Sequence, residues 1–159
     1  MYTDSLEFLE EEREAFRPYE ALAGLTDEQL SIGFVGPDRW SGRDLMAHLV
    51  AWQSYALDVA RELAVNQSSP TKERLDREWD ARGDDINREI QDTWGNLPMD
   101  ELRRRFATLP GELRGYLTVV PETRWLKNAD YLRYFLDETI DHYADHAPDL
   151  EAILAGPPA

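Results

Sequence analysis

The chain has 159 residues, 42% of them hydrophobic, and carries 32 acidic against 17 basic side chains, for a formal net charge of −15. This length and apolar content predict one folded domain over residues 1–159, while the negative charge disfavours nucleic acid and anionic membranes as partners and favours cations. Cysteine does not occur, which excludes disulfides, thiolate metal ligands and a cysteine nucleophile.

The beginning of the chain, MYTDSLEFLEEERE, is acidic and lacks the basic region and apolar run of a secretory signal. No apolar stretch approaches the length that a membrane-spanning helix needs. We therefore expect a soluble, cytoplasmic protein.

Apolar residues at helical spacing predict a first amphipathic helix over residues 4–25. Pro18 should kink or interrupt it, because proline lacks the backbone N–H that helices use. Thr26 resembles the cap of a further short helix, and the glycine-rich residues 33–42 predict a loop.

A second helix is predicted to begin after Ser41, a suitable N-cap with Asp44 in the first turn. It should end in the polar residues 66–70. Its apolar face also contains His48, and the other members of that face are Leu45, Leu49, Trp52, Ala56, Val59 and Leu63.

The rest of the chain predicts three more helical regions, over residues 71–94, 99–119 and 130–154, separated by turn and loop segments. The expected fold class is all-α. Its simplest arrangement is an antiparallel four-helix bundle with an extra helical excursion, between Thr71 and Leu97, joining the second and third core helices.

The three histidines are the strongest functional signal. His142 and His146 are four residues apart, so their imidazoles share one face of the last helix, and His48 lies on the inward face of the second helix. Three nitrogens from two helices suit a divalent metal with open coordination positions. The sequence therefore predicts a metal site formed by these three residues.

Several neighbours could support that site. A metal-bound imidazole usually donates its other N–H to an outer acceptor, and Asp44, Asp141 and Asp145 are the candidates. Asp44 shares a face with His48 and could also bind the metal directly. Trp52, one turn after His48, could form a wall of the metal cavity.

Other chemistries have less support. Phosphate-binding, dinucleotide-binding, nucleophile-elbow and zincin motifs are missing from the sequence. A ferritin-like di-iron site needs Glu-x-x-His pairs, but the residues three positions before His48, His142 and His146 are leucine, threonine and tyrosine.

Two segments resemble a known group of proteins. RWSGRDLMAHLVAWQ is similar to the Trp–x(3)–Asp–x(3)–His-Leu–x(2)–Trp segment of the DinB/YfiT-like metalloenzymes, and TIDHYADHAPDLEAIL is similar to their last-helix H-x-x-x-H element. The spacing between these segments and the Asn-x-x-Ile of INREIQDTW, which begins at Asn87, resemble the ClbS/DfsB branch. From its charged surroundings alone, Asn87 would be a solvated helix residue, whereas the resemblance makes it a candidate residue of the pocket or of the shell around the metal ligands.

The resemblance implies a four-helix bundle, often dimeric, with nickel or zinc bound by His48, His142 and His146. Relatives of this kind include thiol-dependent transferases and isomerases, hydrolases and a self-protection protein that opens a cyclopropane ring. The fold alone does not select among these activities.

Three functions follow from these observations. The first is a metal-dependent enzyme, a hydrolase or a thiol-dependent transferase of detoxification type, acting on a small molecule. The second is a non-catalytic protein that binds or sequesters a small molecule, in self-protection, around a structural metal. The third is a helical bundle whose histidines pair with carbonyls and carboxylates. No residue stands out as a general base.

Overall fold

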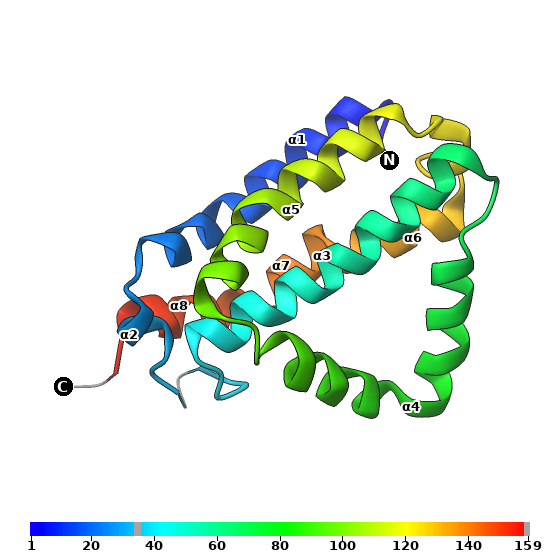
Figure 1. Cartoon of the computed structure of the whole chain (residues 1–159). Coiled ribbons are helices and arrows are strands. Elements are labelled where there is room, and N and C mark those ends of the chain that lie inside the picture. Colours follow the sequence, from blue (N-terminus) through cyan, green and yellow to red (C-terminus); the bar gives the residue numbers. More distant parts are fainter. Residues whose placement is uncertain (34–35, 158–159) are drawn as a thin grey trace.

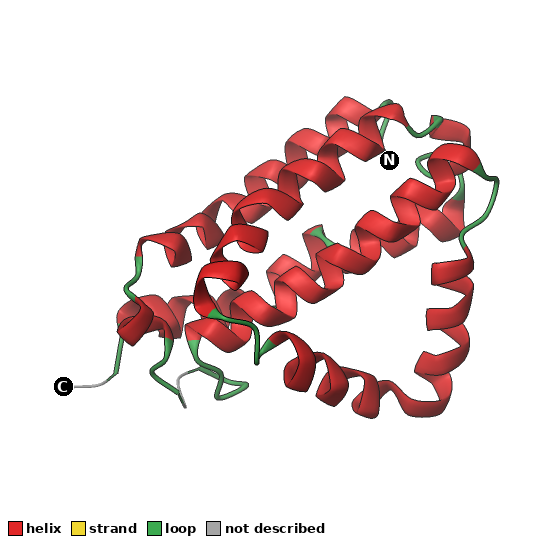
Figure 2. Cartoon of the chain, in the orientation of Figure 1, coloured by secondary structure: helices red, strands yellow, loops and turns green. Residues whose placement is uncertain are grey.

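The computed structural model describes residues 1–33 and 36–157, and every regular element within them is a helix (Figure 2). The all-α prediction is confirmed. Positions 34 and 35 of the loop predicted over residues 33–42 lie outside the described residues. None of the helices described is long and apolar enough to cross a membrane.

The N-terminal segment is interrupted where proline predicts it. Helix α1 covers Ser5–Phe16, and the chain then tightens into a 3₁₀ helix over Arg17–Gly24, with Pro18 in its first turn. Helix α2, Asp27–Leu30, begins at a Thr26 capping box. Both sequence signals are thus confirmed.

Helix α3 covers Gly42–Val65 and is the central helix of the molecule. It begins as predicted, because Ser41 accepts a bond from the Asp44 amide while the Asp44 carboxylate accepts one from the Ser41 amide. The predicted inward face is buried, and His48 is only 6% exposed.

Helix α4, Pro70–Trp94, contains a kink that the sequence does not reveal. Arg82 has non-helical angles, φ −156° and ψ 39°, and its guanidinium pairs with Glu89 at 2.6 Å. In Figure 1 the two halves of α4 form two sides of an angle that faces α3. The kink therefore turns both halves toward the same neighbouring helix.

Helix α5 covers Met99–Val119, and a 3₁₀ turn follows at Glu122–Arg124. The loop predicted after α5 buries Trp125 completely, edge-on to Phe8 at 5.1 Å. It therefore contributes to the core as well as connecting two helices.

The last helix is not continuous, which corrects the prediction of a single helix over residues 130–154. It is divided into α6 (Ala129–Glu138), α7 (Ile140–Asp145) and α8 (Ala147–Ala155). At the first break Thr139 is buried and its hydroxyl donates to the Phe135 carbonyl, a bond that bends helices.

The second break lies at His146, two residues before Pro148, which occupies the first turn of α8 and cannot continue the helical ladder. The His146 amide still donates to the His142 carbonyl at 3.2 Å. The two histidines therefore keep their helical spacing despite the break.

The helices pack around α3. Helices α1 and α5 lie side by side along one side of it, and the α6–α7 segment runs along another (Figure 1). The largest core cluster joins the N-terminal segment, α3, α5, α7 and α8, and a second joins α1, α3, α5 and α6. A smaller cluster, Ala51, Trp52, Ile86 and Ile90, attaches α4.

A buried polar network fixes α7 to the helices around it. The Tyr143 hydroxyl donates to Glu12 at 2.9 Å and accepts from Gln53 at 3.1 Å, and Glu12 also pairs with Arg114. Tyr19 donates to the Tyr143 carbonyl. Because Tyr143 follows His142 directly, this network also fixes the position of one predicted metal ligand.

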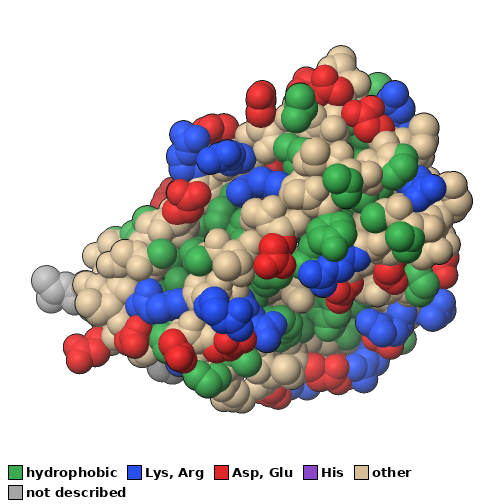
Figure 3. All heavy atoms as spheres, turned by 45° about the horizontal axis from the view of Figure 1, so that its top comes forward, with side chains coloured by type: hydrophobic (Ala, Val, Ile, Leu, Met, Phe, Trp, Pro, Cys, Tyr) green, Lys and Arg blue, Asp and Glu red, His purple; other side chains and the backbone are tan. Residues whose placement is uncertain are grey.

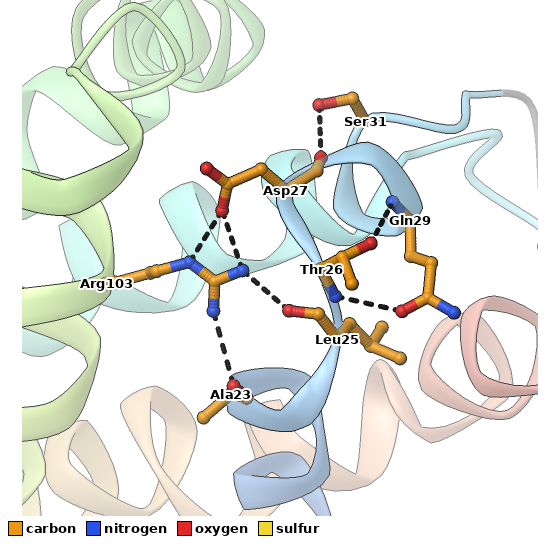
Figure 4. A network of polar contacts seen from close by, with 7 residues as sticks. All are labelled: Ala23, Leu25, Thr26, Asp27, Gln29, Ser31 and Arg103. Carbon is orange, nitrogen blue, oxygen red and sulfur yellow. Dashed lines mark hydrogen bonds and ion pairs between the residues drawn. The ribbon is translucent and has the colours of Figure 1, made fainter.

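On the outside, Arg103 joins α5 to the first residue of α2 and to the chain just before it (Figure 4). Its guanidinium donates to the Leu25 carbonyl at 2.6 Å and to the Asp27 carboxylate at 2.9 Å. Over the face seen in Figure 3, acidic and basic side chains are interspersed with apolar ones. The excess negative charge is thus not gathered into one patch there.

Candidate metal centre

The fold brings the three histidines together. His48 comes from α3, His142 from α7 and His146 from the break between α7 and α8. Their ring centroids are 4.8 to 4.9 Å apart in all three pairs. One nitrogen of each ring lies within 4.8 Å of the other two, so the group could hold a metal ion.

The spacing of the nitrogens agrees with shared coordination. The Nε2 atoms of His48 and His142 are 2.9 Å apart. Two imidazoles bound to one zinc ion at bond lengths near ~2.0–2.1 Å place their nitrogens roughly 3 Å apart. The two rings therefore face each other at a distance that suits one ion.

Burial keeps two of these rings neutral. It lowers the pKa of His48 to about 2, with the neighbouring His142 and His146 acting in the same direction. Burial and His146 likewise lower the pKa of His142 to about 3, although a hydrogen bond with the Glu138 backbone opposes the shift. Metals bind the neutral imidazole, so both rings are ready to coordinate at neutral pH.

An outer carboxylate orients His146. Its Nδ1 lies 3.1 Å from Asp149, a residue that is 1% exposed. Burial raises the pKa of Asp149, but bonds from the Asp38 amide, the His146 ring and the Asp38 carboxyl together hold it below its ordinary value. An ionised carboxylate only accepts, so Nδ1 of His146 carries the proton and Nε2 stays free for a metal.

The chemistry of the facing ring atoms also fits a metal. Within the described parts of the chain, Nδ1 of His48 is buried without a hydrogen-bond partner, whichever of its ring nitrogens carries the proton. The Nε2 atoms of His48 and His142 point at each other, and both can present lone pairs there when one cation binds both. The donor set of three imidazoles suits zinc or nickel.

A cavity of about 680 Å³ opens onto the site. Its wall includes His48 and His142, whereas His146 lies outside it. Its other lining residues come from α3, α4 and α6. The volume is in the range of small-molecule sites.

The three aspartates predicted as outer acceptors make no hydrogen bond to the histidine rings in the described part of the chain. The Asp44 carboxylate is engaged in the capping box with Ser41, and Asp141 pairs with Arg133. Asp145 is exposed. The outer acceptor that the structure shows is Asp149, three residues after His146, and its position on the same helical face was a signal that could have indicated it.

The two predicted pocket residues line the cavity. Trp52 lies edge-on to His48, with centroids 6.4 Å apart. Asn87, which is half-buried, also contributes to the wall. The kink at Arg82 makes this possible, because it lets residues from both halves of α4 face one cavity. Trp40 stacks on His146, with ring centroids 5.2 Å apart.

Glu138 is a cavity residue that the sequence analysis missed. It precedes His142 by four residues, so both lie on one helical face, a signal that helical spacing offered. Burial, with some help from Asp137, raises its pKa to about 8. Glu138 therefore carries a proton at neutral pH and could exchange it with a ligand in the cavity.

This shift predicts a pH-dependent stability. Between pH 6.5 and 8 folded Glu138 holds a proton that the unfolded chain, near 4.5, has released, so metal-free protein should lose stability as pH rises. We expect the free energy of unfolding, measured with urea, to fall by up to about 1.4 kcal/mol per pH unit. The Glu138→Gln variant should not show this fall. Equal slopes in both proteins would contradict the shift. The lowered pKa values of His48 and His142 act only below pH 6.5, where they reduce stability on acidification.

Comparison with known proteins places the chain in a family. Among curated proteins and among solved structures, nothing matches it. The family model of the DinB superfamily matches residues 9–150, nearly the whole chain, including all three histidines. The chain belongs to the DinB superfamily.

Proposed function

We propose that the protein is a divalent-metal-dependent enzyme that acts on a small molecule. The observation that carries this proposal is the opening of a cavity directly onto His48 and His142. A structural metal site is closed by protein ligands, whereas a catalytic one keeps a position for substrate or water. Three imidazoles beside a cavity correspond to the second kind.

Each residue has a defined task in this proposal. His48, His142 and His146 would hold the ion, and Asp149 keeps the His146 ring in the tautomer that presents Nε2. Zinc or nickel supplies Lewis-acid chemistry, polarising a substrate oxygen or lowering the pKa of bound water. Glu138, whose pKa is raised to about 8 in the metal-free chain, lies in the cavity wall, where its carboxyl group would donate a proton to a bound ligand.

Finer assignments are part of the same proposal. We take the reaction to be hydrolysis or thiol-dependent transfer, with an external thiol because the chain has no cysteine. Helices α1, α3, α5 and the divided last helix would form an antiparallel four-helix bundle with α4 as the excursion. The Asn87 segment supports membership of the ClbS/DfsB branch, and we propose a cytoplasmic homodimer.

A second function is favoured by the same cavity if the ion has no reactive role. The protein would then bind or sequester a small molecule in the cavity, around a structural metal whose coordination positions are closed to that molecule. The two functions differ in whether an exogenous ligand reaches the ion.

Metal analysis tests the proposal. Protein purified without chelator should contain one zinc or nickel ion per chain, and returning metal to the stripped protein should raise its melting temperature by several degrees. Binding at 100 times Kd stabilises by about 2.7 kcal/mol. Protein that contains no metal and whose melting temperature does not respond would contradict the proposal.

The cobalt-substituted protein separates the two functions. Adding 2-mercaptoethanol should change the visible spectrum if a coordination position is open to the cavity. An unchanged spectrum would favour the non-catalytic function.

A further inference from the structure

The charges around the cavity are unbalanced. Its two basic residues are already neutralised: Lys72 pairs with Asp76 at 2.7 Å, and Arg133 pairs with Asp137 at 3.0 Å and with a further aspartate outside the cavity. Three more acidic residues line it: Glu138, whose raised pKa keeps it neutral in the metal-free chain, and two aspartates.

Those two carboxylates, Asp80 and Asp130, have no ion-pair or hydrogen-bond partner for their side chains among the described residues. Both are exposed. The cavity therefore presents a surplus of negative charge to an incoming ligand.

The walls of the cavity are aromatic. Trp79 is 47% exposed and lies edge-on to Trp52, with centroids 5.7 Å apart. The Lys72 ammonium lies 5.9 Å from the centroid of Tyr134, so one aromatic face already accepts a cation. Indole rings beside carboxylates are the combination that recognises organic ammonium groups.

Two residues of the cavity wall also carry buried polar atoms without a partner among the described residues. Tyr134 is only 8% exposed, and its hydroxyl has no hydrogen-bond partner within the described chain. The same holds for the side-chain oxygen of Asn87. A buried group of this kind is costly unless something binds it. The exposed carboxylates of Asp80 and Asp130 offer acceptors, which calls for a ligand that donates.

We propose that the cavity binds a small organic cation, a protonated amine attached to an apolar or aromatic group. The ammonium would lie near Asp80, Asp130 and the aromatic walls, and the apolar part would extend toward Trp52 and the histidines. This inference rests on the proposed function, because it takes this cavity as the substrate site. Carboxylate and phosphate substrates are disfavoured by the same charge surplus.

Three matched probes test the proposal on metal-free protein, which removes direct coordination of an amine by the ion. Phenethylamine is cationic at neutral pH, 2-phenylethanol is neutral and phenylacetate is anionic. Titration followed by calorimetry and tryptophan fluorescence should show the amine binding at least about tenfold more tightly than the alcohol, with the acid weakest. Equal binding of amine and alcohol, tighter binding of the acid, or no binding of any probe would overturn the proposal.

Two variants locate the binding. Asp80→Asn combined with Asp130→Asn should weaken amine binding by about fivefold, and Trp79→Leu by a similar factor. The control, Asp84→Asn with Asp100→Asn, removes the same charge from exposed positions that do not line the cavity. It should change amine binding by less than about twofold. If the control and cavity variants weaken amine binding equally, the amine is attracted by the net negative charge of the whole protein, and the proposed cavity site is wrong.

The two proposals fail separately. Metal content is measured on the same preparation before stripping. If the protein contains no metal but binds the amine selectively, the proposed metal-dependent function is wrong and the proposed organic-cation ligand is supported. If the protein contains metal but binds all three probes equally, the metal site is supported and the proposed organic-cation ligand is wrong.

Discussion

Replacing His142 by alanine is expected to abolish stoichiometric metal binding. His142 faces His48 with 2.9 Å between their Nε2 atoms and lines the cavity, so its loss leaves two ligands. Removing a residue that hydrogen-bonds a metal ligand weakens metal binding by about 10–100-fold, and removing a direct ligand should weaken it by more than about 100-fold. Competition with a chromophoric chelator measures this affinity, and far-UV circular dichroism should show unchanged helicity.

Two aspartate variants near the site serve as controls. Asp149→Asn removes the acceptor of His146 and should weaken metal binding by about 10–100-fold. Asp145→Asn makes the same chemical change at an exposed neighbour and should leave affinity as in the parent. Tight binding by His142→Ala, or equal effects of the two aspartate variants, would show that the ligand assignment is wrong.

Among the proposed variants, Glu12→Ala should cause the largest loss in the free energy of unfolding. Glu12 is 1% exposed and accepts bonds from Arg114 and the Tyr143 hydroxyl, so its removal leaves a guanidinium and a phenol without their acceptor. Breaking a buried ion pair from one side costs about 3–5 kcal/mol, and we expect about 3 because Arg114 keeps some exposure. Urea unfolding of the metal-free protein measures the loss.

Glu14→Ala is the matched control. Glu14 lies on the same helix and pairs with Arg17, but both side chains are more than 60% exposed. Such a pair contributes at most about 1 kcal/mol. Similar losses for the two glutamate variants would refute the role of the buried network. Since Tyr143 adjoins His142, Glu12→Ala should also weaken metal binding, whereas Glu14→Ala should not.

Local signals in the sequence predicted much of the structure. The Thr26 and Ser41 caps, the interruption at Pro18 and the buried face of α3 all depend on residues within a turn or two of one another. The positions of the three histidines on inward faces also follow from helical spacing. These features are local, so composition and periodicity are enough to find them.

Other features depend on contacts between distant segments. The break at Thr139 combines a local hydroxyl bond with complete burial of that residue, and no periodic pattern marks it. The kink at Arg82 likewise leaves the apolar spacing intact while redirecting half of α4. The charged neighbours of Asn87 in the sequence therefore predict a solvated residue, whereas in the structure Asn87 lies in a cavity wall.

The amino-acid sequence by itself determined the helical class, the caps at Thr26 and Ser41 and the imidazoles available for a metal, because these follow from backbone propensities and side-chain chemistry. Only the tertiary structure decided that His48 meets His142 across 94 positions of chain, that Asp149 hydrogen-bonds the His146 ring, and that Glu138 lies in the cavity. Distances between helices come from side-chain packing over the whole core, and no short stretch of sequence contains that information.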